Sequence, residues 1–400
     1  MMLDIPEIFH QNSNPAENLA LPVIQSDSRW TEFVAHLSQF GEMDIPDTRD
    51  QLEILLAQEG SPAKRAVLIT GISKCTVGEG KFLEGAQLLG YAYSLLTDSD
   101  GDSKAFVLLE MVSLLAIIGS YDNALMLLRT VDSLTDSFYL KKIANYYGLV
   151  NVGRKGDAGV IEALKNSADY FKSINSTATL AYHYKNIGNI YGKLKEFDET
   201  ESWYNKALSL VDETKFKHIR AAVLHDMGML RYRQSDFESA IELLQQSYQM
   251  ADSFYTKAYT IGNMGFLYYQ QKKRATAMVH FEKALDIATQ KGVFHLVPSS
   301  CYYLGTCAEQ LDKKSLAGYY YEKGSSVALE LAKLKFPLKG ERLLIVNAYI
   351  QFLQNNPSID ITSPEHYDFS FAIGKTLKEI RAAFQETLLD IMLKKTGTVR

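Results

Sequence analysis

Apolar and small residues recur along the chain with the spacing of two helices that pack against each other. The stretch from Leu180 to Leu210 reads LAYHYKNIGNIYGKLKEFDETESWYNKALSL, with Gly188 at the point where two helices would cross. Phe197 falls at the turn between them, and Tyr204 follows the glycine by sixteen residues. Because a small residue opposite a large one lets two helices approach closely, the pattern predicts a helical hairpin. An isolated hairpin leaves one apolar face uncovered, so further copies are expected on either side.

Copies of this pattern occupy most of the chain. The crossing position is held in turn by Ser73, Val112, Gly148, Gly188, Gly228, Gly265 and Gly305, at offsets of 36 to 40 residues. A large apolar residue follows each of them by sixteen positions: Leu89, Leu128, Leu164, Tyr204, Leu244, Phe281 and Tyr321. A repeat of this length predicts an all-α fold, a solenoid of about seven stacked hairpins.

The segments outside the repeat differ from it in composition. Prolines and asparagines near the N-terminus separate two short helical patterns, one from Ser28 to Phe40 and one from Asp47 onwards. An apolar helix from Glu341 to Leu353 would close the other end of the array. The predicted segments are an N-terminal helical cap (1–60), the array (61–330), a closing helix (331–355), a linker (356–374) and a basic amphipathic helix (375–400).

Composition indicates an ordinary globular protein. Hydrophobic residues make up 46% and charged residues 22%, and the net charge of −5 argues against a chain that coats nucleic acid. The cysteines Cys75, Cys301 and Cys307 are too scattered for a disulfide framework and show no metal-ligand spacing. The N-terminus lacks the features of a signal peptide, and no apolar run reaches the roughly 20 residues of a transmembrane helix. We therefore expect a cytoplasmic protein without membrane contact.

Candidate catalytic and phosphate-binding motifs are incomplete. The sequences around Gly80 and Gly374 lack the earlier glycine of a phosphate-binding loop, and the acidic run at Asp98 lacks the glycine and glutamate of a calcium loop. None of the eight histidines forms a recognisable nucleophile arrangement with a serine or cysteine. We therefore expect no enzymatic activity, no metal and no cofactor.

The hairpins resemble a known helical repeat. The segments EFDETESWYNKAL, DFESAIELLQQS and ATAMVHFEKALDIA resemble the tetratricopeptide repeat, and the resemblance covers about residues 65–330. The period is nearer 39 residues than the family's 34, which is similar to the repeat arrays of bacterial regulators. The resemblance implies a right-handed superhelix whose concave groove is lined by the first helix of each hairpin. The implied binding residues are Lys142, Asn145, Tyr146, Tyr182, Lys185, Asn186, Asn189, His225, Asp226, Tyr259, Asn263, Tyr302 and Tyr303.

Asparagine and tyrosine side chains dominate this implied groove, and their chemistry suits an extended peptide. An asparagine amide can donate and accept, so it matches a peptide backbone whatever the side chains are. Tyrosine supplies apolar area with a polar tip, and Lys142 or Lys185 could pair with a carboxylate. The sequence therefore predicts a peptide or a protein segment as partner. The alternative is that this face is only the solvated side of the array, with tyrosine used for packing.

The basic segment at the C-terminal end leaves several outputs open. Residues 375–400 carry a net charge of +3, and Phe384, Leu388, Leu389 and Met392 form one apolar helical face. This segment resembles the first helix of a Fis-type helix-turn-helix, which implies transcription regulation with DNA bound through an extended C-terminus. Alternatively, the helix caps the array or joins a homodimer, and the protein is a docking adaptor without a DNA role. A third alternative is a regulatory phosphatase resembling the Rap proteins, for which residues 1–60 show no motif.

Overall fold

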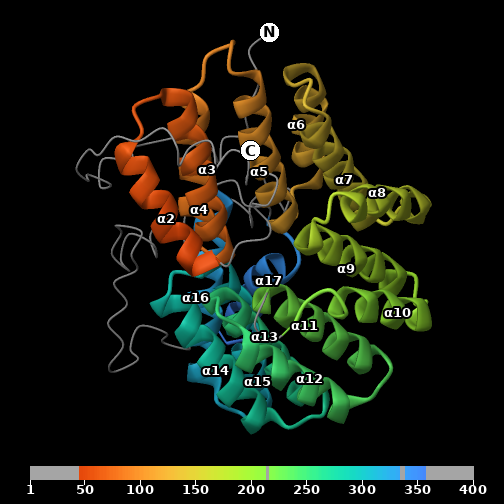
Figure 1. Ribbon diagram of the computed structural model, residues 1–400. Coiled ribbons are helices and arrows are strands. Elements are labelled where there is room, and N and C mark those ends of the chain that lie inside the picture. Colours follow the sequence, from red (N-terminus) through yellow and green to blue (C-terminus); the bar gives the residue numbers. More distant parts are fainter. Residues whose placement is uncertain (1–44, 213–215, 334–337, 357–400) are drawn as a thin grey trace, which may run out of the picture. The chain divides into compact units, whose positions relative to one another are not determined.

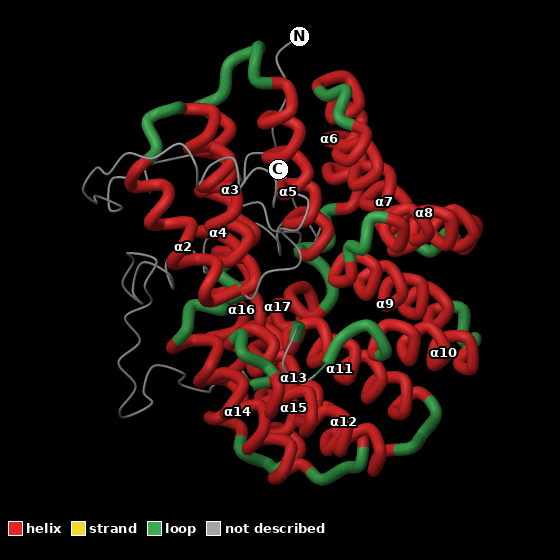
Figure 2. The backbone as a smooth tube through the Cα atoms, viewed as in Figure 1, coloured by secondary structure: helices red, strands yellow, loops and turns green. Residues whose placement is uncertain are grey.

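All the secondary structure that the structure describes is helical. The computed structural model describes residues 45–212, 216–333 and 338–356, and within these ranges there are helices and turns but no strand (Figure 2). The predicted all-α class is thereby confirmed. The predicted helix over 28–40, the linker and the basic helix at 375–400 lie outside the described residues.

The helices follow one another as antiparallel pairs (Figure 1). After α2 (Ile45–Gln58) come the pairs α3 (Pro62–Gly78) and α4 (Phe82–Ser94), α5 (Gly101–Ile117) and α6 (Tyr121–Leu134), α7 (Phe138–Arg154) and α8 (Ile161–Ser173), α9 (Thr177–Lys193) and α10 (Phe197–Leu208), α11 (Lys217–Arg233) and α12 (Phe237–Met250), α13 (Phe254–Gln270) and α14 (Arg274–Gln290), and α15 (Val297–Gln310) and α16 (Lys314–Lys333). The last described helix is α17 (Glu341–Asn355), and 3-10 turns precede α8 (Ala158–Val160) and α15 (Phe294–Leu296). These pairs are the hairpins that the repeat predicts.

The chain forms two compact units, Met1–Thr260 and Ile261–Arg400. Within the first unit, α2 packs on α3, and successive hairpins from α3 to α11 pack side by side. Within the second unit, α17 packs against α15 and α16. No helix among the described residues is long and apolar enough to cross a membrane.

Small residues at the crossing positions let the two helices of a hairpin approach closely. A Cβ atom added to Gly188 would lie 2.7 Å from the ring of Tyr204, and one added to Gly305 would overlap the ring of Tyr321. Gly148 differs, because its added Cβ would meet nothing nearer than a methyl group of Leu128, at 3.8 Å. The 3-10 turn before α8 accompanies this looser crossing, so the third hairpin departs from the predicted close contact with Leu164.

The turn between the two helices of each hairpin has a common backbone conformation. One residue with positive φ follows the crossing position by seven residues, or by eight in the third hairpin: Gly80, Gly119, Gly156, Lys195, Ser235, Lys272 and Asp312. This left-handed conformation ends the first helix and turns the chain towards the second. The recurrence supports the same seven-hairpin register that the side chains indicate.

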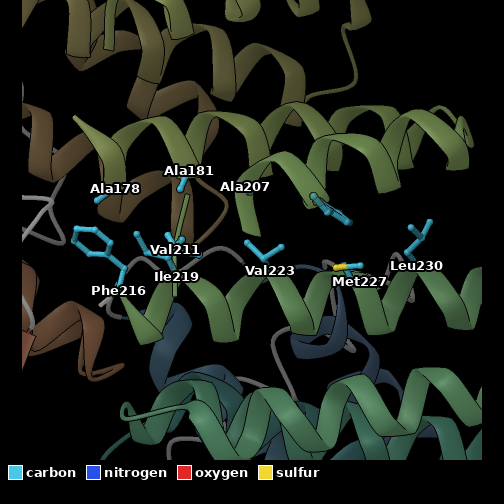
Figure 3. Packing of buried hydrophobic residues seen from close by; sticks show 10 residues of the cluster. Ala178, Ala181, Ala207, Val211, Phe216, Ile219, Val223, Met227 and Leu230 are labelled. Carbon is cyan, nitrogen blue, oxygen red and sulfur yellow. The ribbon is translucent and has the colours of Figure 1, made fainter. Parts of the chain in front are cut away.

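Apolar side chains join one hairpin to the next. Between α9–α10 and α11, the buried layer consists of Ala178, Ala181, Tyr204, Ala207, Val211, Phe216, Ile219, Val223, Met227 and Leu230 (Figure 3). Alanines on α9 and α10 face larger side chains on α11, so the layers interdigitate. Each fully buried large side chain contributes about 1.5–3 kcal/mol through its removal from water.

Candidate functional site

Polar side chains link the first helices of neighbouring hairpins in the first unit. Lys185 Nζ on α9 lies 2.7 Å from Asp226 Oδ2 on α11, and Asn186 Nδ2 on α9 donates to Tyr146 Oη on α7 at 2.6 Å. These residues lie two or three positions before the crossing residue of their hairpins, which is the register that the resemblance implies for the groove. Their binding role stays a prediction. We refer to the first helix of each hairpin as its A-helix. The A-helix face consists of the following residues: Lys74, Glu110, Tyr146, Lys185, Asn186, His225, Asp226 and Tyr259.

The centre of the A-helix face is an ion pair with a neighbouring imidazole. The side chains of Lys185 and Asp226 are 15% and 21% exposed, so the pair is shielded but still reachable from solvent. His225 Nδ1 lies 3.2 Å from the second carboxylate oxygen of Asp226. Burial alone would raise the pKa of Asp226, but the charge of Lys185 and the contact with His225 outweigh it and hold that pKa well below its usual range. Asp226 is therefore ionised at neutral pH.

Tyr146 is supported from beneath by a buried histidine. The ring of His183 stacks on Tyr146 with 3.5 Å between ring centres, and His183 Nδ1 donates to the carbonyl of Thr179 at 2.9 Å. Its Nε2 lies 3.3 Å from Ser167 Oγ, which can donate to it. Burial lowers the pKa of His183 to about 4, so the ring is neutral at physiological pH. Because both His183 and Ser167 are buried, this serine–histidine contact is part of the packing and has no access to a substrate.

The remaining predicted residues of the first unit have varied surroundings. Tyr259 is 42% exposed, and its ring centre lies 4.7 Å from that of His225. Tyr182 is half-buried, and burial raises its pKa to about 12. Asn189 Oδ1 accepts a hydrogen bond from Tyr204 Oη at 2.5 Å, so this acceptor is engaged within its own hairpin.

Lys142 and Asn145 lie on α7 at the N-terminal side of Tyr146. The ammonium group of Lys142 lies 4.9 Å from the ring centre of Phe138 and 5.7 Å from that of Tyr170. Asn145 is exposed. The structure thus places the Lys142 charge over aromatic rings, where a cation is stabilised by the ring quadrupole.

The predicted residues of the second unit lie in or beside an aromatic cluster. Tyr303 stacks on Phe281 at 5.0 Å with an interplanar angle of 6°, and its ring also contacts Phe266 and Tyr269. Tyr302 is half-buried with its ring centre 5.1 Å from that of Tyr303, and Asn263 is half-buried on α13. The binding role of these residues stays a prediction.

Two charged residues of the A-helix face were missed by the sequence reasoning. Lys74 Nζ on α3 lies 3.2 Å from Glu110 Oε1 on α5, and the Glu110 side chain is buried. Lys74 follows the crossing residue Ser73 by one position, as Asn189 follows Gly188. Glu110 precedes the crossing residue Val112 by two positions, as Asn186 precedes Gly188. Extending the register back to the first two hairpins would have found both.

Comparisons with known proteins agree with this repeat architecture. Two family models described as tetratricopeptide repeat match residues 176–253, which cover α9–α12, and residues 258–291, which cover most of α13 and all of α14. A curated relative, response regulator aspartate phosphatase A of Bacillus subtilis (strain 168), is 26% identical over 164 residues. That match covers 38% of this chain and 41% of the relative, so it spans less than half the length of that protein.

Solved structures of similar fold include a quorum sensor in two states. The apo form of NprR from B. thuringiensis matches with a TM-score of 0.52 and 12% identity, covering 91% of this chain and 97% of that one. NprR in complex with its cognate peptide NprX matches with a TM-score of 0.51 and 13% identity, covering 88% and 100%. At this identity the likeness concerns the fold alone. The family matches show tetratricopeptide repeats at residues 176–253 and 258–291, and the seven hairpins and the likeness in fold agree with them.

Proposed function

We propose that the chain is a non-enzymatic regulatory protein that binds a peptide or a protein segment on the A-helix face. The observation that carries this proposal is the largely shielded Lys185–Asp226 ion pair between two first helices. The buried layer between the same hairpins consists of apolar side chains. Because a shielded ion pair adds little net stability compared with apolar packing, its presence here favours a role in recognition.

The chemistry of the face fits an extended polypeptide. Lys185 and Asp226 offer a donor and an acceptor that can exchange partners with a peptide backbone, and Tyr259 offers an exposed aromatic surface beside them. The solved structure of NprR with its cognate peptide supports the proposal, because a similar fold is recorded there with a peptide ligand.

A charge-removing double variant tests the proposal. Lys185→Gln/Asp226→Asn keeps hydrogen-bonding groups at both positions but removes the ion pair. We expect the full-length variant to lose the peptides that the wild type retains from a random peptide library. Its melting temperature should fall by less than about 4 °C, since replacing both partners of such a pair costs on the order of 1 kcal/mol or less.

The matched control is another ion pair between neighbouring hairpins. Arg231 on α11 pairs with Glu201 on α10, with one nitrogen–oxygen distance of 3.0 Å, and neither residue belongs to the A-helix face. The variant Arg231→Gln/Glu201→Gln should retain the same peptides as the wild type. Equal peptide retention by both double variants would show that the A-helix face is not the binding site.

The regulatory output is a separate part of the proposal. DNA binding through a C-terminus that extends the basic segment at 375–400 would make the protein a transcription regulator, whereas its absence would leave a docking adaptor. Fluorescence anisotropy with random duplex DNA separates them: we expect binding by the full chain and its loss in Lys394→Glu/Lys395→Glu. No binding by the full chain would favour the adaptor.

A phosphatase is the second candidate, favoured by the match to response regulator aspartate phosphatase A. It predicts faster phosphate release from a phosphorylated response regulator when the chain is added. An unchanged rate with several response regulators would remove this candidate.

A further inference from the structure

The turns of the last two hairpins are basic. The turn between α13 and α14 holds Lys272 and Lys273, and α14 begins at Arg274. The turn between α15 and α16 holds Lys313, and α16 begins at Lys314. The four lysines are exposed, Arg274 is half-buried, and all five residues belong to the second unit. We call these five residues the basic edge.

A hydrogen-bonded arginine joins the two turns. Arg274 Nε donates to Gln310 Oε1, three positions before Lys313, and Gln310 Nε2 donates to Tyr269 Oη at 3.3 Å. The guanidinium carbon of Arg274 lies 4.2 Å from the ring centre of Tyr269. Because one guanidinium connects both turns, the lysines beside it and beside Gln310 belong to one surface.

Carboxylates do not neutralise this surface. The turn at 271–274 contains no acidic residue. Beside the other turn, Asp312 is exposed, and Glu309 accepts a hydrogen bond from Tyr321 Oη at 2.6 Å. Within the part of the chain that the structure describes, no carboxylate forms an ion pair with the basic edge. Residues 271–274 and 309–314 carry a net charge of +3 in a chain whose net charge is −5, so the positive charge is local.

The second helices of the first unit begin differently. Each has an acidic residue in its first turn: Glu84 in α4, Asp122 in α6, Glu162 in α8, Asp198 and Glu199 in α10, and Glu238 in α12. The helices α14 and α16 have none. Because a helix N-terminus carries a partial charge of roughly +0.5, an acidic residue there stabilises the helix and a basic residue destabilises it. The stability of the fold therefore does not account for the basic edge.

The composition of the basic edge fits a nucleic acid better than a protein. Lysine is depleted from protein–protein interfaces relative to the rest of the surface, whereas lysine and arginine supply many of the contacts to DNA phosphates. Four of the five residues are exposed lysines. A phosphate beside the first turn of α14 or α16 would also supply the negative charge that an acidic residue supplies in the first unit.

We propose that the basic edge binds the phosphate backbone of duplex DNA. This inference deepens the DNA-binding output proposed above and rests on it. Contacts of this kind carry no base specificity, but they fix the orientation of a protein on the duplex and raise its affinity. They also make the affinity depend strongly on salt, because each neutralised phosphate releases counterions.

The variant Lys272→Gln/Lys273→Gln/Lys313→Gln/Lys314→Gln tests the basic edge and leaves the contacts of Arg274 in place. Binding of the whole chain to a fluorescent random duplex is measured by anisotropy at several salt concentrations. We expect the affinity at low salt to fall about tenfold or more. The slope of log affinity against log salt should become shallower by about 2–4, because each phosphate contact contributes about 0.9.

The matched control removes four exposed positive charges from the first unit. Arg129→Gln/Lys172→Gln/Lys195→Gln/Lys206→Gln should bind the duplex with the affinity and salt slope of the wild type. The basic-edge variant should melt no lower than the wild type, since it removes positive charges from helix N-termini. The smaller variant Lys273→Gln/Lys314→Gln should show about half of the slope change even if the fourfold variant folds poorly.

An acidic protein segment is the competing ligand for the same charges. A fluorescent polyglutamate peptide should bind the wild type more weakly than the duplex does at the same salt concentration. Polyglutamate binding that equals or exceeds duplex binding, and that is lost in the basic-edge variant, would assign the surface to an acidic protein and overturn the inference.

The remaining outcomes separate this inference from the proposed DNA binding. Unchanged affinity and salt slope in the basic-edge variant, with loss of binding in Lys394→Glu/Lys395→Glu, would overturn the basic edge and leave the C-terminal contact intact. No binding of the duplex by the wild type would overturn both.

Discussion

In the first unit, positions two and three before the crossing residue hold charged side chains such as Lys185 and Asp226, which pair between neighbouring first helices. In the second unit, the same register of the last hairpin holds Tyr302 and Tyr303, and Tyr303 stacks on Phe281. The same two positions of the repeat thus form polar contacts between helices in the first unit and pack aromatic rings in the second. Substitutions at these two positions of the first unit should therefore change ligand binding, and substitutions in the aromatic cluster of the second unit should change stability.

The largest expected effect concerns the aromatic cluster of the second unit. Phe281 is buried under Tyr303, so Phe281→Ala should lower the free energy of unfolding by about 3–5 kcal/mol through lost burial and a cavity. The measurement is urea unfolding followed by circular dichroism. Val279→Ala on the same helix is the control, because Val279 is 62% exposed and should cost less than about 0.5 kcal/mol. Similar losses in both variants would mean that the cluster does not hold this unit together.

Low pH should destabilise the first unit by protonating His183, which stacks on Tyr146 of the A-helix face. The folded pKa of His183, about 4, lies below its unfolded value of 6.5, so the unfolded chain binds more protons between these values. The stabilising contribution is complete above pH 6.5 and falls by about 3 kcal/mol as the pH drops to 4.

The variant His183→Phe isolates this contribution because it keeps a ring against Tyr146. Its unfolding free energy should decline less steeply than that of the wild type between pH 6.5 and 4. His295 in the second unit, whose pKa burial lowers to about 3, contributes equally to both proteins. Identical slopes in the two proteins would contradict the assignment.

Much of the fold could be predicted from the sequence because hairpin packing depends on side-chain size at fixed spacing. Gly188 and Gly305 meet Tyr204 and Tyr321 as their sixteen-residue offset predicts. Gly148 and Leu164 have the same sixteen-residue offset, but the two helices of that hairpin cross less closely at Gly148, because the 3-10 turn before α8 shifts the second helix. A one-residue change in turn length is invisible to a pattern that scores residue types.

The positions of the candidate site residues along their helices could be predicted from the sequence, but their hydrogen-bond and ion-pair partners could not. Asn186 and Asp226 lie on the predicted face, yet the hydrogen bond of Asn186 to Tyr146 depends on the angle between α7 and α9, which spacing along one helix does not specify. The contact between the ends of α7 and α9 was missed for the same reason. Arg154 and Lys193 are 39 residues apart in sequence, and only the stacking of hairpins brings the Lys193 ammonium to the Arg154 carbonyl.

Two glycines within the first unit provide the next smaller effect. Gly188→Ala should lose about 1–3 kcal/mol, because the new methyl group would lie 2.7 Å from the ring of Tyr204. Gly148→Ala should instead gain up to about 1 kcal/mol from helix propensity, because its methyl group meets only Leu128 at 3.8 Å. Thermal and urea unfolding measure both. Changes of the same sign would show that the two hairpins are equally tight.

The smallest expected effect tests a feature that both units share. Lys195 in the first unit and Lys272 in the second adopt positive φ values of 65° and 62° at the turn of their hairpins. A residue with a side chain loses about 1–2 kcal/mol of folding free energy in this conformation, and glycine avoids this loss. Part of the gain is offset because glycine makes the unfolded chain more flexible. Lys195→Gly and Lys272→Gly should therefore each stabilise the chain by about 0.5–1 kcal/mol.

The opposite change at an equivalent turn is the matched control. Gly119 has a φ of 83° at the same position of the second hairpin, so Gly119→Ala should destabilise the chain by about 1 kcal/mol. In urea unfolding, both Lys→Gly variants should raise the free energy of unfolding and Gly119→Ala should lower it. The turn conformation therefore has the same effect in both units, although the residues on their first helices differ. Stabilisation by Lys195→Gly without stabilisation by Lys272→Gly would mean that the turns, like the faces, have diverged between the units.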